Sequence, residues 1–299
     1  MQQANFLKTG DRIRIVSPAG KVPRQKIEAG VELLQKEGFD IRWGEHVFDS
    51  HFQFASTDEQ RLKDLQEALD DPDCKAIICS RGGYGAIRLV AQLDFSNFRK
   101  HPKWLVGFSD ITILHARIQQ EGFCSIHGAM PGFYLQEEQP TESFAELVKV
   151  LRGQAEAISA PAHNFNREGK GQGLLVGGNL SILYSLLGTS LQANTKGNIL
   201  FIEDLSEYLY HLDRIMHCLK LTGKLEYLHG LIVGGFTEMK DNDSPFGQTA
   251  YEIIQAVVQD YDYPVCFDFP AGHIERNLPL VLGANYTLAV GENEAKLYR

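Results

Sequence analysis

Short apolar runs and stretches with helical spacing alternate along the first half of the chain. Strands are predicted at the apolar runs 12–17, 40–43, 76–80, 104–106 and 123–126. Helices are predicted between them, at 26–37, 59–69 and after residue 109. This alternation is typical of an α/β fold with a parallel sheet covered by helices on both faces. Such sheets bind ligands at the carboxyl ends of their strands, so the polar residues that follow each strand are the functional candidates.

A second alternation follows a stretch with little apolar periodicity. Its predicted strands are 173–176, 198–202, 231–234 and 265–267, its helices are 180–187, 208–221 and 249–258, and 288–297 is a hairpin. Pro161, Asn164 and a charged, glycine-containing run lie in the stretch before it, as in a linker. The sequence therefore predicts an N-terminal domain at 1–155, a linker at 156–172 and a C-terminal domain at 173–299.

Composition narrows the class of protein. The chain has 299 residues, of which 43% are hydrophobic and 22% charged, as in a globular protein with an ample core. The net charge of −9 argues against non-specific binding to nucleic acid or to an anionic membrane. No apolar run is long enough to span a bilayer and the N-terminus has no apolar signal core, so we expect a cytoplasmic protein. The five cysteines are scattered without a C-x-x-C spacing, which disfavours a structural zinc site and a cysteine nucleophile.

A serine stands where one predicted strand breaks into a helix. Trp104–Val106 suits a buried strand, Gly107 permits a tight turn, and Ile111 begins the helical spacing after Ser109. This position exposes a hydroxyl beside backbone N–H groups, as a nucleophile requires. The alternative is that Ser109 only caps the helix. The second glycine of the G-x-S-x-G motif is absent, because Ile111 occupies its place.

Three other segments place polar residues just after apolar runs. The loop 81–85 could turn backbone N–H groups toward an anion, Glu203 ends the strand 198–202, and His273 lies in a loop between turns. Taken singly, Glu203 could be a helix-start charge and His273 a loop histidine bonded to backbone. Together, Ser109, Glu203 and His273 could form a nucleophile, an orienting carboxylate and a general base between the two predicted domains.

Other interpretations stay open at this point. His127 ends a predicted strand and is the main rival base, whereas His115 is expected to be packed or exposed. A metal-dependent amidohydrolase using His127 and His273 lacks an H-x-H or H-E-x-x-H spacing. The run 241–243 lacks the closing glutamate of a calcium loop. A non-catalytic ligand-binding protein on the same fold would not bring Ser109, Glu203 and His273 together.

An ordered series of motifs resembles one known family. The motifs are Arg81-Gly82-Gly83-Tyr84-Gly85, Gly107-Phe108-Ser109-Asp110, Gly177-Gly178-Asn179-Leu180, Ile202-Glu203-Asp204, Gly272-His273 and Asn277-Leu278-Pro279-Leu280. In this order they are similar to the LD-carboxypeptidase family, and the likeness runs from Ile15 to Ala284. The family's catalytic serine, glutamate and histidine fall on Ser109, Glu203 and His273.

The resemblance implies a serine peptidase that releases terminal D-alanine from murein tetrapeptide during cell-wall recycling. It implies no metal or cofactor, commonly a homodimer, and an N-terminal domain like class I glutamine amidotransferases joined to a smaller α/β domain. A related branch hydrolyses peptide-nucleotide antibiotics. On this reading the N–H groups of Asp110 and Gly83 would bind the oxyanion. The carboxylate of D-alanine would meet Arg81, Asn179 or Arg276, although surface solvation is an alternative for each arginine.

Overall fold

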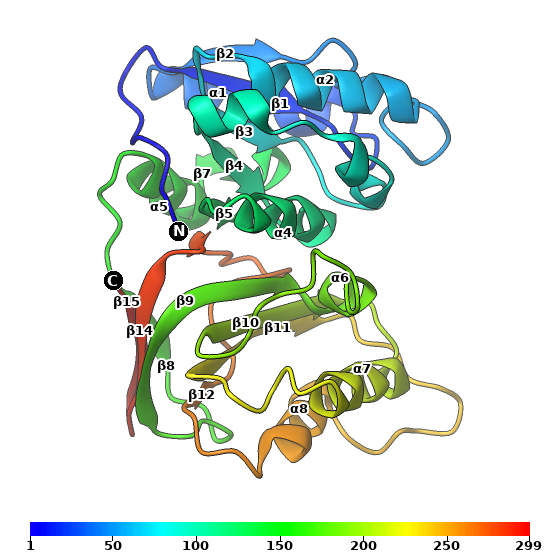
Figure 1. The fold of residues 1–299 in the computed structure, drawn as a ribbon, viewed down its shortest axis with the longest axis vertical. Coiled ribbons are helices and arrows are strands. Elements are labelled where there is room, and N and C mark those ends of the chain that lie inside the picture. Colours follow the sequence, from blue (N-terminus) through cyan, green and yellow to red (C-terminus); the bar gives the residue numbers. More distant parts are fainter. The chain divides into compact units, whose positions relative to one another are not determined.

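The predicted strands and helices fold into two units, each built on its own sheet. Unit 1 comprises Met1–Ala155 and Leu278–Leu282, and unit 2 comprises Glu156–Asn277 and Gly283–Arg299. The structure is a computed structural model that describes all residues from 1 to 299. Both units combine strands and helices, as the sequence predicts (Figure 1).

Unit 1 contains a six-stranded sheet in the order β13-β5-β4-β3-β1-β2. Its strands are β1 (Arg12–Val16), β2 (Asp40–Trp43), β3 (Cys74–Cys79), β4 (Trp104–Gly107), β5 (Ser125–His127) and β13 (Leu280–Leu282). Every neighbouring pair is parallel except β13 with β5. A separate two-stranded ribbon pairs β6 (Leu135–Gln136) with β7 (Gln139–Pro140). The carboxyl ends of β3 and β4 therefore lie at one edge, which carries the loop 81–85 and Ser109.

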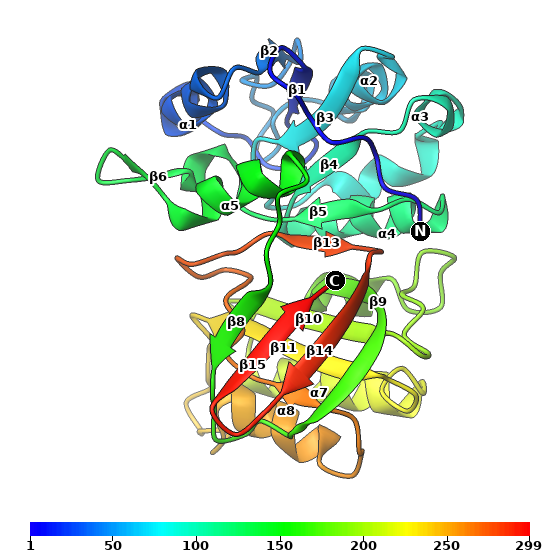
Figure 2. The same ribbon diagram turned by 90° about the vertical axis from the view of Figure 1, so that its left-hand side faces the viewer.

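Helices cover both faces of this sheet. They are α1 (Arg24–Lys36), α2 (Asp58–Asp70), α3 (Ser96–Lys100), α4 (Thr112–Gln120) and α5 (Glu142–Leu151). Figure 2 shows α1 and α5 on one side of the strands and α2, α3 and α4 on the other. A capping box, in which Thr57 and Gln60 each bond the other's backbone N–H, starts α2. The centre of the sheet is shielded from solvent, since every residue of β4 is buried.

Unit 2 contains a seven-stranded mixed sheet in the order β12-β11-β10-β9-β14-β15-β8. Its strands are β8 (Ile158–Pro161), β9 (Gly169–Asn179), β10 (Ile199–Leu205), β11 (Gly230–Thr237), β12 (Val265–Cys266), β14 (Asn285–Val290) and β15 (Glu294–Tyr298). The pairs from β9 to β12 are parallel, whereas β9-β14-β15-β8 is antiparallel. The predicted hairpin near the C-terminus is β14 and β15, and that prediction is confirmed.

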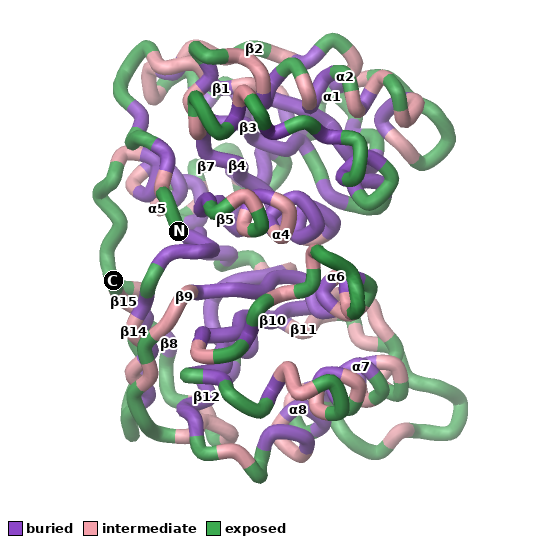
Figure 3. Tube along the Cα trace, viewed as in Figure 1, coloured by how far each residue is buried: buried purple, intermediate pink, exposed green.

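Three helices pack against the parallel part of the unit 2 sheet. They are α6 (Leu180–Ser185), α7 (Leu209–Leu221) and α8 (Ala250–Val258). Leu200, Ile202 and Val233 of the strands join Ile215 and Ile254 of the helices in one buried cluster. Figure 3 shows buried residues along β10 and β11 and exposed ones mainly in the loops. This core fixes the end of β10, where Glu203 lies.

Two features differ from the predicted domain plan. Residues 156–172 contain β8 and the start of β9, so this segment is part of a sheet rather than a linker. Gly171 marks a close backbone approach: a Cβ there would lie 1.6 Å from the carbonyl oxygen of His229. Leu280–Leu282 returns to unit 1, where it pairs with β5 and covers that strand's edge.

No helix in the structure combines the length and the apolar character that crossing a membrane requires.

Candidate active site

Ser109 lies in a strained turn between β4 and α4. Its φ is +64°, a left-handed conformation that side-chain-bearing residues seldom adopt. A 3-10 turn, Ser109–Ile111, follows directly and leads into α4. Gly107 allows the turn to close, because a Cβ there would lie 3.0 Å from Ile111 Cγ1. Strain of this kind is maintained by the surrounding structure and is concentrated at functional sites.

The glycine-rich loop after β3 packs directly on Ser109. A Cβ on Gly82 would lie 2.9 Å from Ser109 Cβ and 3.2 Å from its Oγ, so only glycine fits without displacement. Gly20 fixes the loop from the other side, since its N–H donates to the Gly82 carbonyl at 3.0 Å. A trans peptide directs its C=O and N–H oppositely, so the N–H of Gly83 faces away from Gly20. The loop therefore presents glycine backbone beside the serine hydroxyl.

Unit 2 brings Glu203 and His273 together. Glu203 is fully buried at the end of β10, and its Oε2 lies 2.6 Å from His273 Nδ1. The same oxygen also accepts the backbone N–H of His273 at 3.3 Å. A carboxylate only accepts hydrogen bonds, so Nδ1 carries the hydrogen and Nε2 is the basic nitrogen of neutral His273. This is the tautomer that a general base requires.

The surroundings of His273 hold the ring and keep it basic. Burial lowers the pKa of His273, but the hydrogen bond that His273 donates to Glu203 and the charges of Glu203, Asp204 and Glu238 outweigh it, so the pKa is raised. Thr237 Oγ1 donates to the His273 carbonyl at 3.0 Å. A Cβ on Gly272 would lie 2.7 Å from Glu203 Cβ, so this glycine permits the close contact.

Asp204 supports the same strand end, a role that was not predicted from the sequence. Its Oδ2 accepts the Ser181 N–H at 3.0 Å and the Ser181 hydroxyl at 2.7 Å, which ties β10 to the start of α6. Burial raises the pKa of Asp204 despite hydrogen bonds from Ser181 and Asn179. The signal available in the sequence was a second acid immediately after Glu203 at a strand end.

The predicted substrate-binding residues occupy different environments. Asn179 caps α6, since its Oδ1 accepts the Ile182 N–H at 3.2 Å, and its Nδ2 donates to Asp204 at 2.9 Å. Asn179 therefore has a structural role first. Arg81 is exposed, and its Nη1 donates to the Lys21 carbonyl at 2.9 Å. Arg276 is also exposed.

The rival histidines are packed inside unit 1. His115 Nδ1 lies 2.9 Å from Ser125 Oγ and its Nε2 lies 2.9 Å from the Gly107 carbonyl, and burial lowers its pKa to about 4. His127 is fully buried at the end of β5. Both rings thus belong to the packing beneath the nucleophile turn.

No group of three or more His, Cys, Asp or Glu residues is arranged to hold a metal ion. Asp241, considered above for calcium, instead accepts the N–H of Phe246 at 3.0 Å in a turn.

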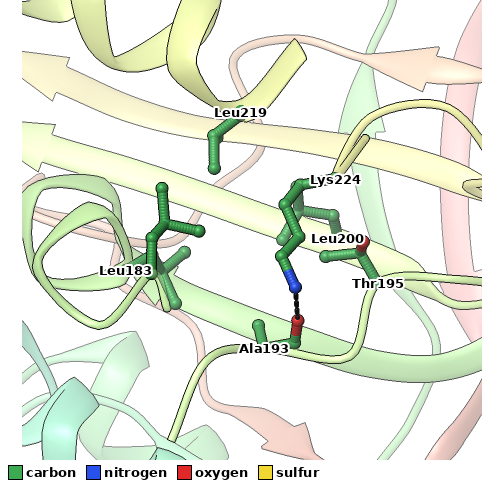
Figure 4. A pocket seen from close by; sticks show the side chains of 7 residues that line it. Leu183, Ala193, Thr195, Leu200, Leu219 and Lys224 are labelled. Atoms are coloured by element: carbon green, nitrogen blue, oxygen red, sulfur yellow. Dashed lines mark hydrogen bonds between the residues drawn. The ribbon is translucent and has the colours of Figure 1, made fainter. Parts of the chain in front are cut away.

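A small pocket in unit 2 offers no comparable chemistry. Leucine side chains form most of its lining: Leu183 of α6, Leu200 of β10, Leu219 of α7, and Leu187 just after α6 (Figure 4). Its charged group, Lys224, donates to the Ala193 carbonyl at 3.1 Å, and burial lowers its pKa. The lining contains no carboxylate or imidazole.

The three predicted catalytic residues are divided between the units. Glu203 and His273 form a bonded pair in unit 2, and Ser109 lies in unit 1 with the glycine loop. Unit 2 thus holds an imidazole hydrogen-bonded to a buried carboxylate, and unit 1 holds a serine hydroxyl on a left-handed backbone turn beside glycine backbone.

Comparison with family models gives matches on both units. A model described as the LD-carboxypeptidase N-terminal domain matches residues 13–128, and one described as the LD-carboxypeptidase C-terminal domain matches residues 172–288.

Individual proteins match over nearly the whole chain. The chain is 33% identical over 298 residues to the "Probable murein peptide carboxypeptidase" of Bacillus subtilis (strain 168), covering 97% of this chain and 92% of that protein. It is 31% identical over 281 residues to the "Murein tetrapeptide carboxypeptidase" of Pseudomonas aeruginosa, covering 89% of each.

Solved structures share the fold. The muramoyltetrapeptide carboxypeptidase from Oxalobacter formigenes superposes with a TM-score of 0.86 at 27% identity, covering 96% of this chain and 97% of that chain. The microcin C7 self immunity protein MccF gives a TM-score of 0.87 at 23% identity, covering 99% and 98%, and this likeness shows the fold alone.

Proposed function

The chain belongs to the LD-carboxypeptidase family, and we propose that it is a serine carboxypeptidase that releases terminal D-alanine from murein tetrapeptide. The resemblance inferred from the motif series is thereby confirmed at the level of the family. The observation that carries the proposal is the 2.6 Å hydrogen bond between Glu203 and His273, which orients the imidazole as a base. The relatives named for murein peptides support this substrate class.

In the proposed reaction, His273 Nε2 accepts the proton of the Ser109 hydroxyl as the serine oxygen attacks the carbonyl before D-alanine. Glu203 holds the tautomer and stabilises the imidazolium that forms. The N–H groups of Asp110 and Gly83 bind the oxyanion. Asp110 is suited to this because the first N–H groups of a helical turn have no partner within the helix. His273 then protonates the leaving amine, and water hydrolyses the acyl-enzyme at Ser109.

The substrate carboxylate requires a cation or N–H donors, and we assign this role to Arg81 or Arg276 because both are exposed guanidinium groups next to the motifs. A substrate contact by Asn179 stays a prediction and adds to its capping role. Comparing the affinities for the free tetrapeptide and its C-terminal amide tests the clamp. Equal affinities would show that no carboxylate clamp exists.

The decisive test is digestion of a defined L,D-tetrapeptide followed by mass spectrometry, with the pentapeptide and a D,D-linked peptide as controls. Wild type should release D-alanine from the tetrapeptide only. Ser109→Ala, His273→Ala and Glu203→Gln should each lose most of this activity. His211→Ala is a matched control, because His211 Nδ1 also lies 2.6 Å from a glutamate, Glu207, in the same unit. Full activity in Ser109→Ala would refute the proposal.

Hydrolysis of peptide-nucleotide antibiotics is the second candidate for the same residues. A structural relative has been solved in complex with aspartyl sulfamoyl adenosine, at 23% identity. Cleavage of that compound without cleavage of the tetrapeptide would favour this alternative. The homodimer, the cytoplasmic location and the likeness of the N-terminal domain to glutamine amidotransferases stay predictions.

A further inference from the structure

The side chain of Asp110 makes a hydrogen bond that is separate from the oxyanion contact proposed for its backbone N–H. Asp110 follows Ser109 in the turn and is only 1% exposed, and its Oδ2 accepts the N–H of Ala86 at 2.9 Å. Ala86 ends the same loop whose Gly82 packs on Ser109. Two consecutive residues of the nucleophile turn thus hold the glycine loop at two points, by contact at one end and by a hydrogen bond at the other.

Arg61 supports this arrangement from α2. Its side chain is buried, and Nη1 donates to the Pro18 carbonyl at 2.6 Å while Nε donates to the Ser56 carbonyl at 3.2 Å. Gly85 lies so close that a Cβ there would be 2.5 Å from Arg61 Nη1. The guanidinium therefore packs against the loop between Gly82 and Ala86, at Gly85.

A buried carboxylate is costly unless its charge is compensated. Burial raises the pKa of Asp110 to about 6, although the N–H groups of Ala86 and Gly85 and the charge of Arg61 oppose this shift. Its second oxygen, Oδ1, is buried without a hydrogen-bond partner. An apolar side chain would fill this position at a lower desolvation cost, so packing alone does not explain why a carboxylate is present.

We propose that the Asp110 carboxylate, supported by Arg61, is a positioning group that holds the Gly82–Gly83 backbone against Ser109 so that the oxyanion donors are in place before substrate arrives. Preorganised donors stabilise a transition state because no reorganisation is needed during the reaction. The inference rests on the proposed function for its catalytic consequence. The mechanical part, the tethering of the loop, does not depend on it.

The test compares Asp110→Ala with a matched buried carboxylate in the same unit. Asp64 is 2% exposed, and its Oδ2 accepts the N–H of His46 at 2.8 Å, away from the nucleophile turn. Asp110→Ala should lower kcat for D-alanine release by roughly 10²–10³-fold, as loss of an oxyanion donor does, with KM changed by less than about threefold. Hydrogen exchange at the Ala86 amide should accelerate. Asp64→Ala should lower the melting temperature and leave kcat within about twofold of wild type.

A second variant keeps the test valid if Asp110→Ala does not fold. Asp110→Asn is nearly isosteric and retains one acceptor oxygen for Ala86, so it should restore part of kcat and part of the exchange protection. Unchanged exchange at Ala86 in folded Asp110→Ala would overturn the proposal. A kcat of either Asp110 variant equal to that of Asp64→Ala would also overturn it. Failure of the wild type to release D-alanine would instead refute the proposed function, and the exchange rates would still test the tether.

Discussion

The left-handed conformation of Ser109 predicts an unusual order of stability between two variants that lack its hydroxyl. Its φ of +64° costs a residue with a Cβ about 1–2 kcal/mol, whereas glycine adopts it freely. Replacing alanine by glycine normally destabilises a protein by about 0.5–1 kcal/mol, because the unfolded chain gains entropy. At position 109 the relief of strain exceeds this loss. Ser109→Gly should therefore be more stable than Ser109→Ala by roughly 0.5–1 kcal/mol.

Thermal and denaturant unfolding of the two full-length variants measures this difference. Neither variant has a hydroxyl, so the comparison isolates the backbone from the chemistry. For a unit of this size the expected gain is about 1–4 °C in melting temperature. Ala116→Gly, within the neighbouring helix α4, is the control and should lose about 1 kcal/mol. A Ser109→Gly variant that is less stable than Ser109→Ala by a similar amount would refute the claim that the turn stores strain.

Three further predictions concern the Glu203–His273 pair. Burial lowers the pKa of His273, but the hydrogen bond to Glu203 and the charges of Glu203, Asp204 and Glu238 together outweigh it. Glu203→Gln removes the negative charge nearest the ring and should therefore move the acid limb of the kcat/KM profile to lower pH; an unmoved limb would contradict this. Because the raised pKa belongs to the folded state, the pair's contribution to stability is full below about pH 6.5 and is lost as pH rises through the folded pKa. The free energy of unfolding, measured across this range, should therefore decline more steeply with pH in wild type than in Glu203→Gln. Equal slopes would contradict this. Gly272→Ala would place a Cβ 2.7 Å from Glu203 Cβ and should destabilise by roughly 1–3 kcal/mol with a marked loss of kcat. Gly188→Ala is its control, because Gly188 has a φ of +77° but open space around it; an equal loss of activity in that variant would show that the contact with Glu203 is not the cause.

Local patterns predicted the elements well where the signal is contained in a few residues. The strand Asp40–Trp43 has the predicted bounds, and the break after β4 places Ser109 at the start of a helical turn. Contacts between distant segments left no such signal. Leu280–Leu282 pairs with a strand more than 150 residues away in the sequence, and Arg61 lies under Gly85 only because α2 packs beside β3. Spacing along the chain reports which face of an element is apolar, not which segment covers it.

In each unit a glycine packs directly against a predicted catalytic side chain. The sequence shows these glycines but not the side chains that they contact. Gly82 faces Ser109 at 2.9 Å and Gly272 faces Glu203 at 2.7 Å, measured from the Cβ that any other residue would add. Both glycines are visible in the sequence as parts of motifs, but the side chain that requires each one is contributed by a different strand end. A Cβ at either position would push first on the functional group and only then on the core. Substitution of these glycines should therefore reduce kcat by a larger factor than the accompanying loss of stability explains.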